Sequence, residues 1–353
     1  MTLGVFKASG FRCLESVSLD PDPHLNLIAG ANASGKTSLL EAIYYLGRGR
    51  SFRASGNREL IRTGSSQFTL YGEISGGDRA HKAGIEVESG SRRVRVDGAN
   101  ATGADLAAIL PVQAIDPEIH NLVQGGPEYR RRFLDWGVFH VKHSFLGEWR
   151  RFQQALRQRN AALRAGEPDS AVQVWDSELA EGGEAVNQLR ESFFEAYIQL
   201  LSSIINEKLP FDAKCSYRRG WKADTSLYAA LQESLARDRA MGSTQVGPHR
   251  ADLALEVHDR RARYRVSRGQ QKLLAATMVI AQVRLIAGEG SDDLVLLVDD
   301  PAAELDRDNR ARLFALLQDV PAQMFVTALE AEDLPWADSG RMFHVNQGAL
   351  KQT

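Results

Sequence analysis

The chain has 353 residues and a formal net charge of −2. Its hydrophobic fraction of 43% and charged fraction of 25% are ordinary for a folded globular protein and exclude a mainly disordered chain. It contains no run of about 20 apolar residues that would span a bilayer, and its first residues lack the apolar segment of a signal peptide. We therefore expect a cytoplasmic protein that does not act at a membrane.

The first part of the chain predicts short strands around one helix. Val, Ile and Phe recur in brief alternating runs separated by turn residues, which is typical of half-buried strands. We assign residues 1–116 to the N-terminal part of an α/β head domain. The predicted strands are residues 3–8, 17–19, 68–74, 84–87 and 94–96.

A phosphate-binding loop lies within this part. Residues 30–37 read GANASGKT and match the pattern G-x-x-x-x-G-K-[S/T]. A short apolar strand at residues 25–29 precedes the loop and an amphipathic helix begins near Lys36, so we set aside an accidental glycine-rich turn. Lys36 is expected to reach the β- and γ-phosphates, and Thr37 to ligate Mg²⁺. The residues expected to contact ATP are Gly30, Ala31, Asn32, Ala33, Ser34, Gly35, Lys36, Thr37 and Ser38.

Arginines occur in clusters although the net charge is slightly negative. Guanidinium groups bind DNA phosphates without reading the base sequence, and such clusters are also common on solvated protein faces, so both interpretations stay open. The first candidates for DNA contact are Arg48, Arg50, Arg53, Arg130 and Arg131. Further clusters are Arg92, Arg93 and Arg95, and Arg260, Arg261, Arg263 and Arg265.

Residues 117–243 predict a helical subdomain inserted into the head. Apolar residues recur there at three- and four-residue steps, but the segment is too short for a long coiled coil. His140 and His143 lie one helical turn apart, yet no third ligand is near them and we expect no metal site. We interpret His249 as a turn residue rather than a catalytic one.

Residues 244–353 predict the return of the chain to the head. The sequence SRGQQK at residues 267–272 opens a helix, and its use in a nucleotide-binding protein is to dock on the nucleotide of a second subunit. We therefore expect an ATP-dependent homodimer. The remaining predicted elements are strands at residues 253–257 and 294–298, a helix from Asp306, and a last strand at residues 323–326.

Two carboxylates end the apolar run at residues 294–298. Such a run predicts a central parallel strand, whose carboxyl end lies at the ligand-binding edge of an α/β sheet. Asp299 is expected to serve Mg²⁺, and Asp300 to orient or deprotonate the attacking water. Because many related ATPases carry Glu at the second position, the shorter Asp300 suits slow hydrolysis and a switch function.

These features together resemble the RecF family of bacterial DNA replication and repair ATPases, relatives of the SMC-type ABC ATPases. The resemblance covers nearly the whole chain and is carried by GFRCLE, GANASGKTSLLEAIYYLGRGRSFR, GGPEYRRRFLDWGVFH, RQRNAALR, VGPHRADL, VSRGQQKLL and LVDDPAAELD. It implies an ABC/SMC-type P-loop head with an inserted helical subdomain, and a cytoplasmic, weak, DNA-stimulated ATPase. It further implies binding to duplex DNA and single-strand/double-strand junctions, and action with RecR and RecO in loading RecA and inducing the SOS response.

The resemblance also assigns roles to residues outside the loop. Gln113 matches the Q-loop, which couples the metal to the helical lobe, and Arg12 matches an arginine near the nucleotide. Thr327 stands where other ABC ATPases have a switch histidine. The residues that would meet the partner subunit are Ser267, Gly269 and Gln270 of the signature and Asp306 of the D-loop.

Two positions depart from the family pattern. Ala33 replaces a usual Gly, which weakens the loop if the backbone needs a positive φ there. Cys13 replaces a usual Asn, and we expect both cysteines, Cys13 and Cys215, to be buried thiols.

Two other functions share some of these motifs. A transporter ATPase subunit needs a membrane partner and usually has the switch histidine, and an SMC-like organiser of DNA needs a much longer coiled coil. Both stay as alternatives at this point.

Overall fold

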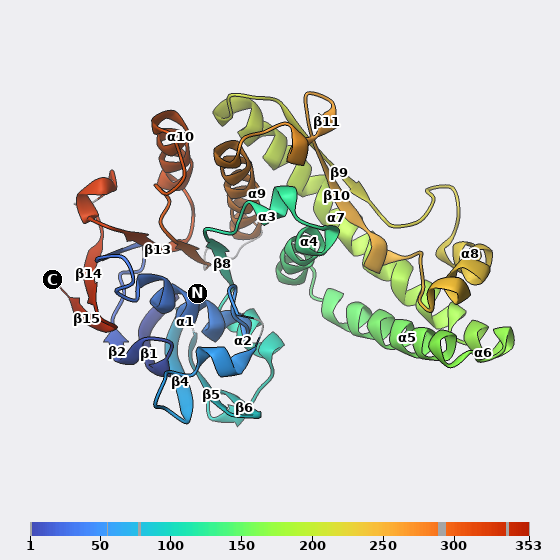
Figure 1. Ribbon diagram of the computed structural model, residues 1–353, viewed down its shortest axis with the longest axis horizontal. Helices are drawn as coiled ribbons and strands as arrows, with labels where there is room; N and C mark the ends of the chain where they lie inside the picture. The colour runs from blue at the N-terminus through green and yellow to red at the C-terminus, as the bar shows by residue number, and fades with distance from the viewer. Residues whose placement is uncertain (1, 55, 77–78, 289–293, 337–338, 353) are drawn as a thin grey trace. The chain divides into compact units, whose positions relative to one another are not determined.

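The computed structural model describes residues 2–54, 56–76, 79–288, 294–336 and 339–352. It divides into two compact units, here called unit 1, which is Met1–Ile119 with Ala276–Thr353, and unit 2, which is His120–Ala275 (Figure 1). No helix in the described part of the chain combines the length and apolar character needed to cross a membrane.

Unit 1 contains an antiparallel sheet that confirms the predicted N-terminal strands and extends each of them. Its six strands lie in the order β2-β1-β4-β5-β6-β7. In β4 every second residue from Phe68 to Ile74 is buried, so one face of the sheet meets the core. The strands are β1 (Thr2–Phe11), β2 (Leu14–Leu19), β4 (Gln67–Gly76), β5 (Arg79–Glu88), β6 (Ser91–Val96) and β7 (Ala99–Asn100).

A second six-stranded sheet of unit 1 has the order β15-β14-β3-β13-β12-β8. Its strands from β14 to β8 pair in parallel, and β15 pairs antiparallel with β14. The prediction that residues 323–326 form the last strand is wrong, because β14 and β15 follow. The strands are β3 (Leu25–Ala29), β8 (Val112–Ile115), β12 (Val295–Val298), β13 (Gln323–Ala328), β14 (Arg341–Asn346) and β15 (Ala349–Gln352).

Helix α1 (Lys36–Arg48) contacts strands of both sheets and belongs to the main apolar core of unit 1. Ten consecutive residues from Ser38 to Gly47 are buried, as expected of a helix covered on all sides. Near its end, Tyr45 meets Phe11 and Phe68 edge to face, with ring centroids 6.3 and 5.4 Å away. The other helices of unit 1 are η1 (Asn57–Leu60), α2 (Gly103–Ile109), α10 (Arg307–Gln318) and η4 (Ala331–Asp333).

Unit 2 is mainly helical, as predicted, but it also holds a three-stranded sheet of order β11-β10-β9. The strands are β9 (Ala213–Arg218), β10 (Asp252–Val257) and β11 (Arg260–Arg261). The helices are α3 (Asn121–Gln124), α4 (Pro127–Val141), α5 (Phe145–Ala165), α6 (Asp169–Gln173), α7 (Asp176–Lys208), α8 (Leu227–Met241), η2 (Pro248–Arg250) and η3 (Ala262–Tyr264). Helix α9 (Arg268–Gly288) begins in unit 2 and ends in unit 1.

The division by contacts differs from the predicted division at residues 116/117 and 243/244. The first junction is similar, whereas the second lies at Ala275. The second boundary differs because of β9, a strand that the sequence analysis did not predict. Because β10 pairs with β9 along its whole length, residues 252–257 belong to unit 2 and not to the head.

The helices of unit 2 enclose buried ion pairs. The fully buried Arg159 donates hydrogen bonds of 2.6 Å to both Asp176 and Asp238. It donates a further one of 2.9 Å to Thr244. A buried cation needs such partners because it has lost its hydration.

Candidate nucleotide-binding site

The phosphate loop lies at the carboxyl edge of the parallel strands of unit 1. Ile28 pairs with Thr327 on β13, and Val326 pairs with Val298 on β12. Gly30, Thr327 and Asp299 therefore come to the same edge from three neighbouring strands, the edge at which α/β sheets bind ligands.

Two glycines shape the loop through their backbone conformation and their close packing. Gly30 and Gly35 have φ of 155° and 115°, values that side-chain-bearing residues rarely adopt. A Cβ at Gly30 would lie 2.3 Å from the carbonyl oxygen of Val345, and one at Gly35 would lie 3.1 Å from Sγ of Cys13. Packing therefore requires glycine at position 30, and the positive φ favours glycine at position 35, before any phosphate is considered.

Ala33 has a positive φ of 62°, the conformation in which we expect an alanine to weaken the loop. The left-handed conformation costs an L-residue roughly 1 kcal/mol because Cβ approaches the following carbonyl group. The loop carries this strain at a position where the family usually has Gly.

The Lys36 ammonium donates hydrogen bonds to the carbonyl groups of Gly30 and Ala31, at 2.6 and 3.0 Å. The side chain thus folds over its own loop. A phosphate entering the loop would replace two carbonyl dipoles with full negative charges, a stronger partner for an ammonium group.

Asp299 is 4% exposed and is the centre of a hydrogen-bond network. It accepts from the hydroxyl of Thr37 at 2.8 Å and from the hydroxyl of Thr327 at 2.7 Å. The Thr327 oxygen in turn accepts from the backbone N–H of Asp300 at 2.8 Å. Thr327 therefore orients the carboxylate of Asp299 and holds the backbone of Asp300, which adopts a strained φ of 46°. This role differs from that of a switch histidine.

A cavity of about 300 Å³ opens beside this network. The sequence predicted that the loop and both carboxylates belong to this site, but it did not indicate Cys13, Arg53 or Pro117 as lining residues. Cys13 is exposed into the cavity, so the prediction that it is buried is wrong, whereas Cys215 is buried as predicted. The lining residues are Cys13, Asn32, Ala33, Ser34, Gly35, Lys36, Thr37, Ser38, Arg53, Pro117, Asp299 and Asp300.

Thr37 and Asp299 fit a magnesium ion. They bring a hydroxyl and a carboxylate within hydrogen-bond distance of each other at the cavity wall. Magnesium in nucleotide sites takes one or two such protein oxygens and completes its shell with phosphates and water.

Gln113 and Arg12, both assigned by resemblance, are not among the residues that line the cavity. Gln113 lies beside Leu296 on the neighbouring strand, three positions before Asp299, or about 10 Å along a strand. Its buried amide donates to Gln282 at 2.9 Å, so this geometry does not support metal coupling by Gln113. Arg12 forms two hydrogen bonds of 2.9 Å with the buried Glu41, which raise the pKa of its guanidinium.

The signature lies in unit 2. Ser267 is exposed just before α9, where it accepts from the N–H of Gln270, and the side chain of Gln270 accepts from the N–H of Ser267 at 2.9 Å. This reciprocal cap presents the first turn of a long helix to solvent, which suits an anion brought by another molecule. Gly269 lies in that turn. Asp306 caps α10 by accepting from the N–H of Asn309.

The arginine candidates separate by burial. Arg130 is 8% exposed and is held by both carboxylate oxygens of Asp252 at 2.7 and 3.1 Å, so its assignment to DNA is not supported. Arg48 lies over the ring of Tyr44, and burial lowers the pKa of its guanidinium. Arg131 is half-buried and donates to a carbonyl group at 2.9 Å. Of the remaining two, Arg53 faces the cavity and Arg50 is exposed.

Comparison with known proteins gives a consistent assignment. Residues 2–351 match the model of the family described as RecF/RecN/SMC N terminal domain. The chain is 41% identical over 361 residues to the DNA replication and repair protein RecF of Stutzerimonas stutzeri (strain A1501), covering 100% of this chain and 98% of the relative. It is 40% identical over 356 residues to the RecF of Shewanella baltica (strain OS155 / ATCC BAA-1091), covering 99% of each. The chain therefore belongs to the RecF/RecN/SMC family and, within it, to the RecF proteins.

Solved structures agree with the fold. The recombination mediator protein RecF-ATP of the RecFOR pathway superposes with a TM-score of 0.89 at 25% identity, over 100% of this chain and 97% of the other. An Smc head bound to the C-winged helix domain of ScpA is similar in fold, with a TM-score of 0.61 at 17% identity, over 100% and 97% of the two chains. The predicted ABC/SMC-type ATPase head is confirmed, and the chain is an ATP-binding protein of that class.

Proposed function

We propose that this chain is an ATP-switched DNA-binding protein of replication and recombinational repair. The observation that carries the proposal is that the two parts of the site belong to different units and that the second part is exposed. The loop, Thr37 and Asp299 lie together in unit 1, whereas the signature at Ser267 is exposed in unit 2 and makes its side-chain hydrogen bonds within its own first turn. In the proposed dimer, the signature of a second chain completes the site in which the first chain holds its nucleotide. ATP then forms the contact between the two chains.

Each residue of the site has a role in this proposal. The N–H groups of the loop and Lys36 bind the triphosphate, with Arg53 as a further cation at the cavity wall. Thr37 and Asp299 would hold Mg²⁺, which when bound neutralises phosphate charge. Asp300 orients the attacking water, and Thr327 holds Asp299 and Asp300 in place through its hydroxyl. Ser267, Gly269 and Gln270 act on the γ-phosphate of the partner, and Asp306 lies at the dimer contact.

The dimer would enclose duplex DNA next to single-strand gaps, and hydrolysis would release it. ATP binding shifts the population toward the dimer because only the dimer offers the complete site. Slow, DNA-stimulated hydrolysis then sets the lifetime of the complex on DNA. Arg50 is our first candidate for a phosphate contact, followed by Arg131 and Arg48, and we leave Arg130 out because its guanidinium is held by Asp252.

The names of the relatives support the wider role. They are DNA replication and repair proteins, and the solved RecF acts in the RecFOR pathway. We therefore propose RecO and RecR as partners, promotion of RecA loading and of the SOS response as outcomes, and the cytoplasm as the place of action. Similarity to RecF proteins over the whole chain favours this function over a transporter subunit or an SMC-like organiser.

The test mixes two variants that are each inactive for a different reason. Lys36→Met lacks the phosphate-binding ammonium, and Ser267→Arg blocks the signature. If the site forms between chains, a 1:1 mixture regains about a quarter of wild-type ATP turnover, because random pairing leaves one complete site in half of the dimers. Turnover is measured with gapped duplex, plain duplex, single-stranded DNA and no DNA.

A mixture as inactive as its components would contradict a site shared between chains. Equal turnover with all four DNA conditions would contradict the DNA-coupled switch while leaving the shared site intact. Retained folding of both variants is checked by circular dichroism.

A further inference from the structure

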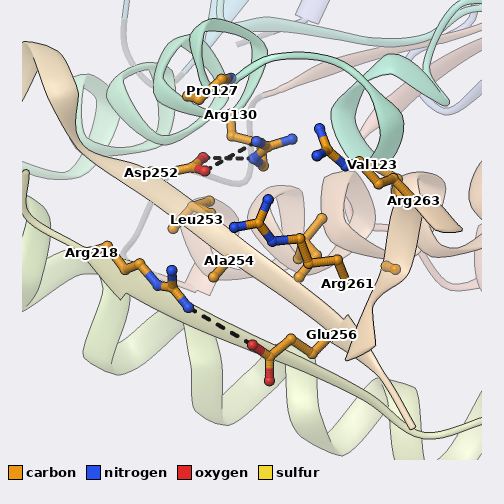
Figure 2. Close-up of a pocket in the computed structure, with 12 residues that line it drawn as sticks. Val123, Pro127, Arg130, Arg218, Asp252, Leu253, Ala254, Glu256, Arg261 and Arg263 are labelled. Atoms are coloured by element: carbon orange, nitrogen blue, oxygen red, sulfur yellow. Dashed lines mark hydrogen bonds and ion pairs between the residues drawn. The ribbon is translucent and has the colours of Figure 1, made fainter. Parts of the chain in front are cut away.

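Unit 2 contains a second cavity, of about 280 Å³, that the nucleotide chemistry does not use (Figure 2). It lies between helices α3 and α4 on one side and the strands β9, β10 and β11 with η3 on the other. Apolar atoms in the lining come from Val123, Pro127 and Ala254, whereas Leu253 and Leu255 alternate with the charged residues of β10 and are buried. Four guanidinium groups and two carboxylates line the rest, a net charge of +2, and they belong to Arg130, Arg218, Arg261, Arg263, Asp252 and Glu256.

Arg130 forms a fixed wall of this cavity. Its guanidinium donates to both oxygens of Asp252 and also to the carbonyl groups of Leu122 and Gly125, at 3.3 and 2.9 Å. These bonds use the three nitrogens of the group. The charge of Arg130 is therefore balanced by Asp252, and the surplus positive charge of the cavity comes from other residues.

Arg261 and Arg263 supply that surplus. Both are exposed, and neither forms an ion pair with any residue that the structure describes. Figure 2 shows their guanidinium groups turned into the cavity toward that of Arg130. The guanidinium carbon of Arg263 lies 4.4 Å from the ring centre of Tyr264, a stacking contact that limits its freedom. The third exposed cation, Arg218, reaches Glu256 only at 3.8 Å.

The lining suits an anion. Arg130 balances Asp252, and the two guanidinium groups of Arg261 and Arg263 match a carboxylate held between two guanidinium forks. Among the described residues that line the cavity none is aromatic, so a nucleobase finds no ring there to stack on. Val123, Pro127 and Ala254 offer apolar contact to an aliphatic side chain. We propose that this cavity binds an acidic peptide segment of a partner protein, in which a carboxylate stands next to an aliphatic residue.

The cavity wall continues directly into the signature. The carbonyl group of Ala262, which lines the cavity between the two surplus arginines, accepts from the N–H groups of Arg265 and Val266, at 2.9 and 3.3 Å. Ser267 follows at once. A peptide that orders Arg261 and Arg263 would therefore also order the segment that presents Ser267, and so alter ATP turnover in trans; this second consequence rests on the proposed function, whereas the binding itself does not.

The test measures peptide binding to the full chain without nucleotide. The probe is a fluorescein-labelled peptide LDDLDL, followed by fluorescence anisotropy. Unlabelled LNNLNL lacks the carboxylates and SDDSDS lacks the aliphatic side chains, so each competes poorly if both features are recognised. Inorganic phosphate and a duplex oligonucleotide serve as competitors that represent other sources of negative charge.

The variants are matched within one segment. Arg261→Ala combined with Arg263→Ala removes the two surplus cations and is expected to weaken LDDLDL binding at least about tenfold. Arg260→Ala combined with Arg265→Ala removes the same charge from neighbouring exposed arginines outside the lining and is expected to change the Kd less than about twofold.

The proposal is overturned by any of four results: no saturable LDDLDL binding at about 1 mM, equal competition by LNNLNL, stronger competition by phosphate or duplex DNA than by the acidic peptide, or equal weakening in both variant pairs. A loss of ATP-dependent dimerisation in the Arg261/Arg263 variant with unchanged peptide binding would assign the cavity to a second copy of the chain, and would also overturn it. Because no nucleotide is present in the binding assay, failure of the proposed ATP switch leaves this test intact.

Discussion

Both compact units bury charged side chains, but they place them differently. In unit 1 the buried carboxylate of Asp299 lies at a sheet edge, bound to the hydroxyls of Thr37 and Thr327 and next to a cavity of about 300 Å³. In unit 2 the buried Arg159 is enclosed by Asp176 and Asp238 within the helices. Burial of charge alone therefore does not mark a functional site. A buried charge next to a cavity does mark one. Removing the network of unit 1 should therefore mainly change ATP turnover, whereas removing that of unit 2 should mainly change the free energy of unfolding.

The largest expected effect is on the stability of unit 2. Arg159→Met leaves two buried carboxylates without their cation and should lower the free energy of unfolding by about 3–5 kcal/mol. ATP binding by the folded protein should persist, because the phosphate loop belongs to unit 1. Urea unfolding and binding of a fluorescent ATP analogue measure the two properties.

The matched control is Arg151→Met on the same helix. Arg151 pairs with Glu178 and Glu181 at the surface, with 39% of its side chain exposed. Exposed pairs are weak, so this variant should lose less than about 1 kcal/mol. Equal losses in the two variants would show that the buried network of unit 2 has no special structural weight.

The next effect is a pH dependence that also belongs to unit 2. Burial lowers the pKa of His249 to about 4 from an ordinary 6.5. Between these values the unfolded chain binds a proton that the folded chain does not, so the free energy of unfolding falls as the pH is lowered through this window. Over the whole window, the free energy of unfolding should fall by about 3 kcal/mol.

Urea unfolding at pH 7 and pH 4.5 should show this loss, and His249→Gln should reduce it. His24→Gln, which changes an exposed histidine of unit 1, should leave the difference between the two pH values unchanged. If both variants behave like the wild type, His249 does not carry the effect.

In unit 1 the expected effect is on chemistry and is smaller in energy. Thr327→Val removes the hydroxyl that holds Asp299 and Asp300, and should lower ATP turnover by about ten- to a hundredfold, equivalent to about 1–3 kcal/mol. Steady-state turnover and nucleotide binding measure the change, and binding should weaken less than turnover. Thr327→Ser keeps the hydroxyl and should restore most of the activity. An inactive Ser variant would mean that packing, not the hydrogen bonds, explains the role of Thr327.

The smallest effect concerns strain in the phosphate loop. Ala33→Gly relieves the positive φ and should raise the free energy of unfolding by roughly 0.5–1 kcal/mol. Ala31→Gly is the control, because φ at Ala31 is not positive and glycine there should lower stability. Urea unfolding compares them, and a similar loss in both would contradict the strain at Ala33.

Much of unit 1 could be predicted because its signals are local. Residues 30–37 carry their own turn chemistry, and the run before Asp299 has the length and composition of a buried strand. Strand β9 reads AKCSYR and alternates apolar with polar residues, a strand signal that our sequence analysis did not use within a segment it took as helical. The same omission explains why the predicted second boundary differs from the division into units, since β10 could not be assigned to unit 2 without its partner strand.

Two predicted assignments that the geometry does not support depend on where a side chain points. Gln113 and Arg130 have residue types suited to a metal and to DNA, yet Gln113 pairs with Gln282 and Arg130 with Asp252. Both partners lie more than 120 positions away in the chain. Nothing in a local pattern indicates such pairings.

The sequence by itself determined the class of fold, the phosphate loop and the two carboxylates, because contiguous residues set these features through backbone geometry and hydrophobic periodicity. Only the tertiary structure decided which charges are free to act. It joined Thr37 to Asp299 and Thr327 across the parallel sheet, and it used Arg130 and Arg159 in internal pairs. It also placed the side chains of Arg261 and Arg263 at the wall of an open cavity. The physical reason is that distant segments of the chain supply the partner groups and the cavities. They therefore decide whether a charged side chain is held in an internal pair or faces a cavity.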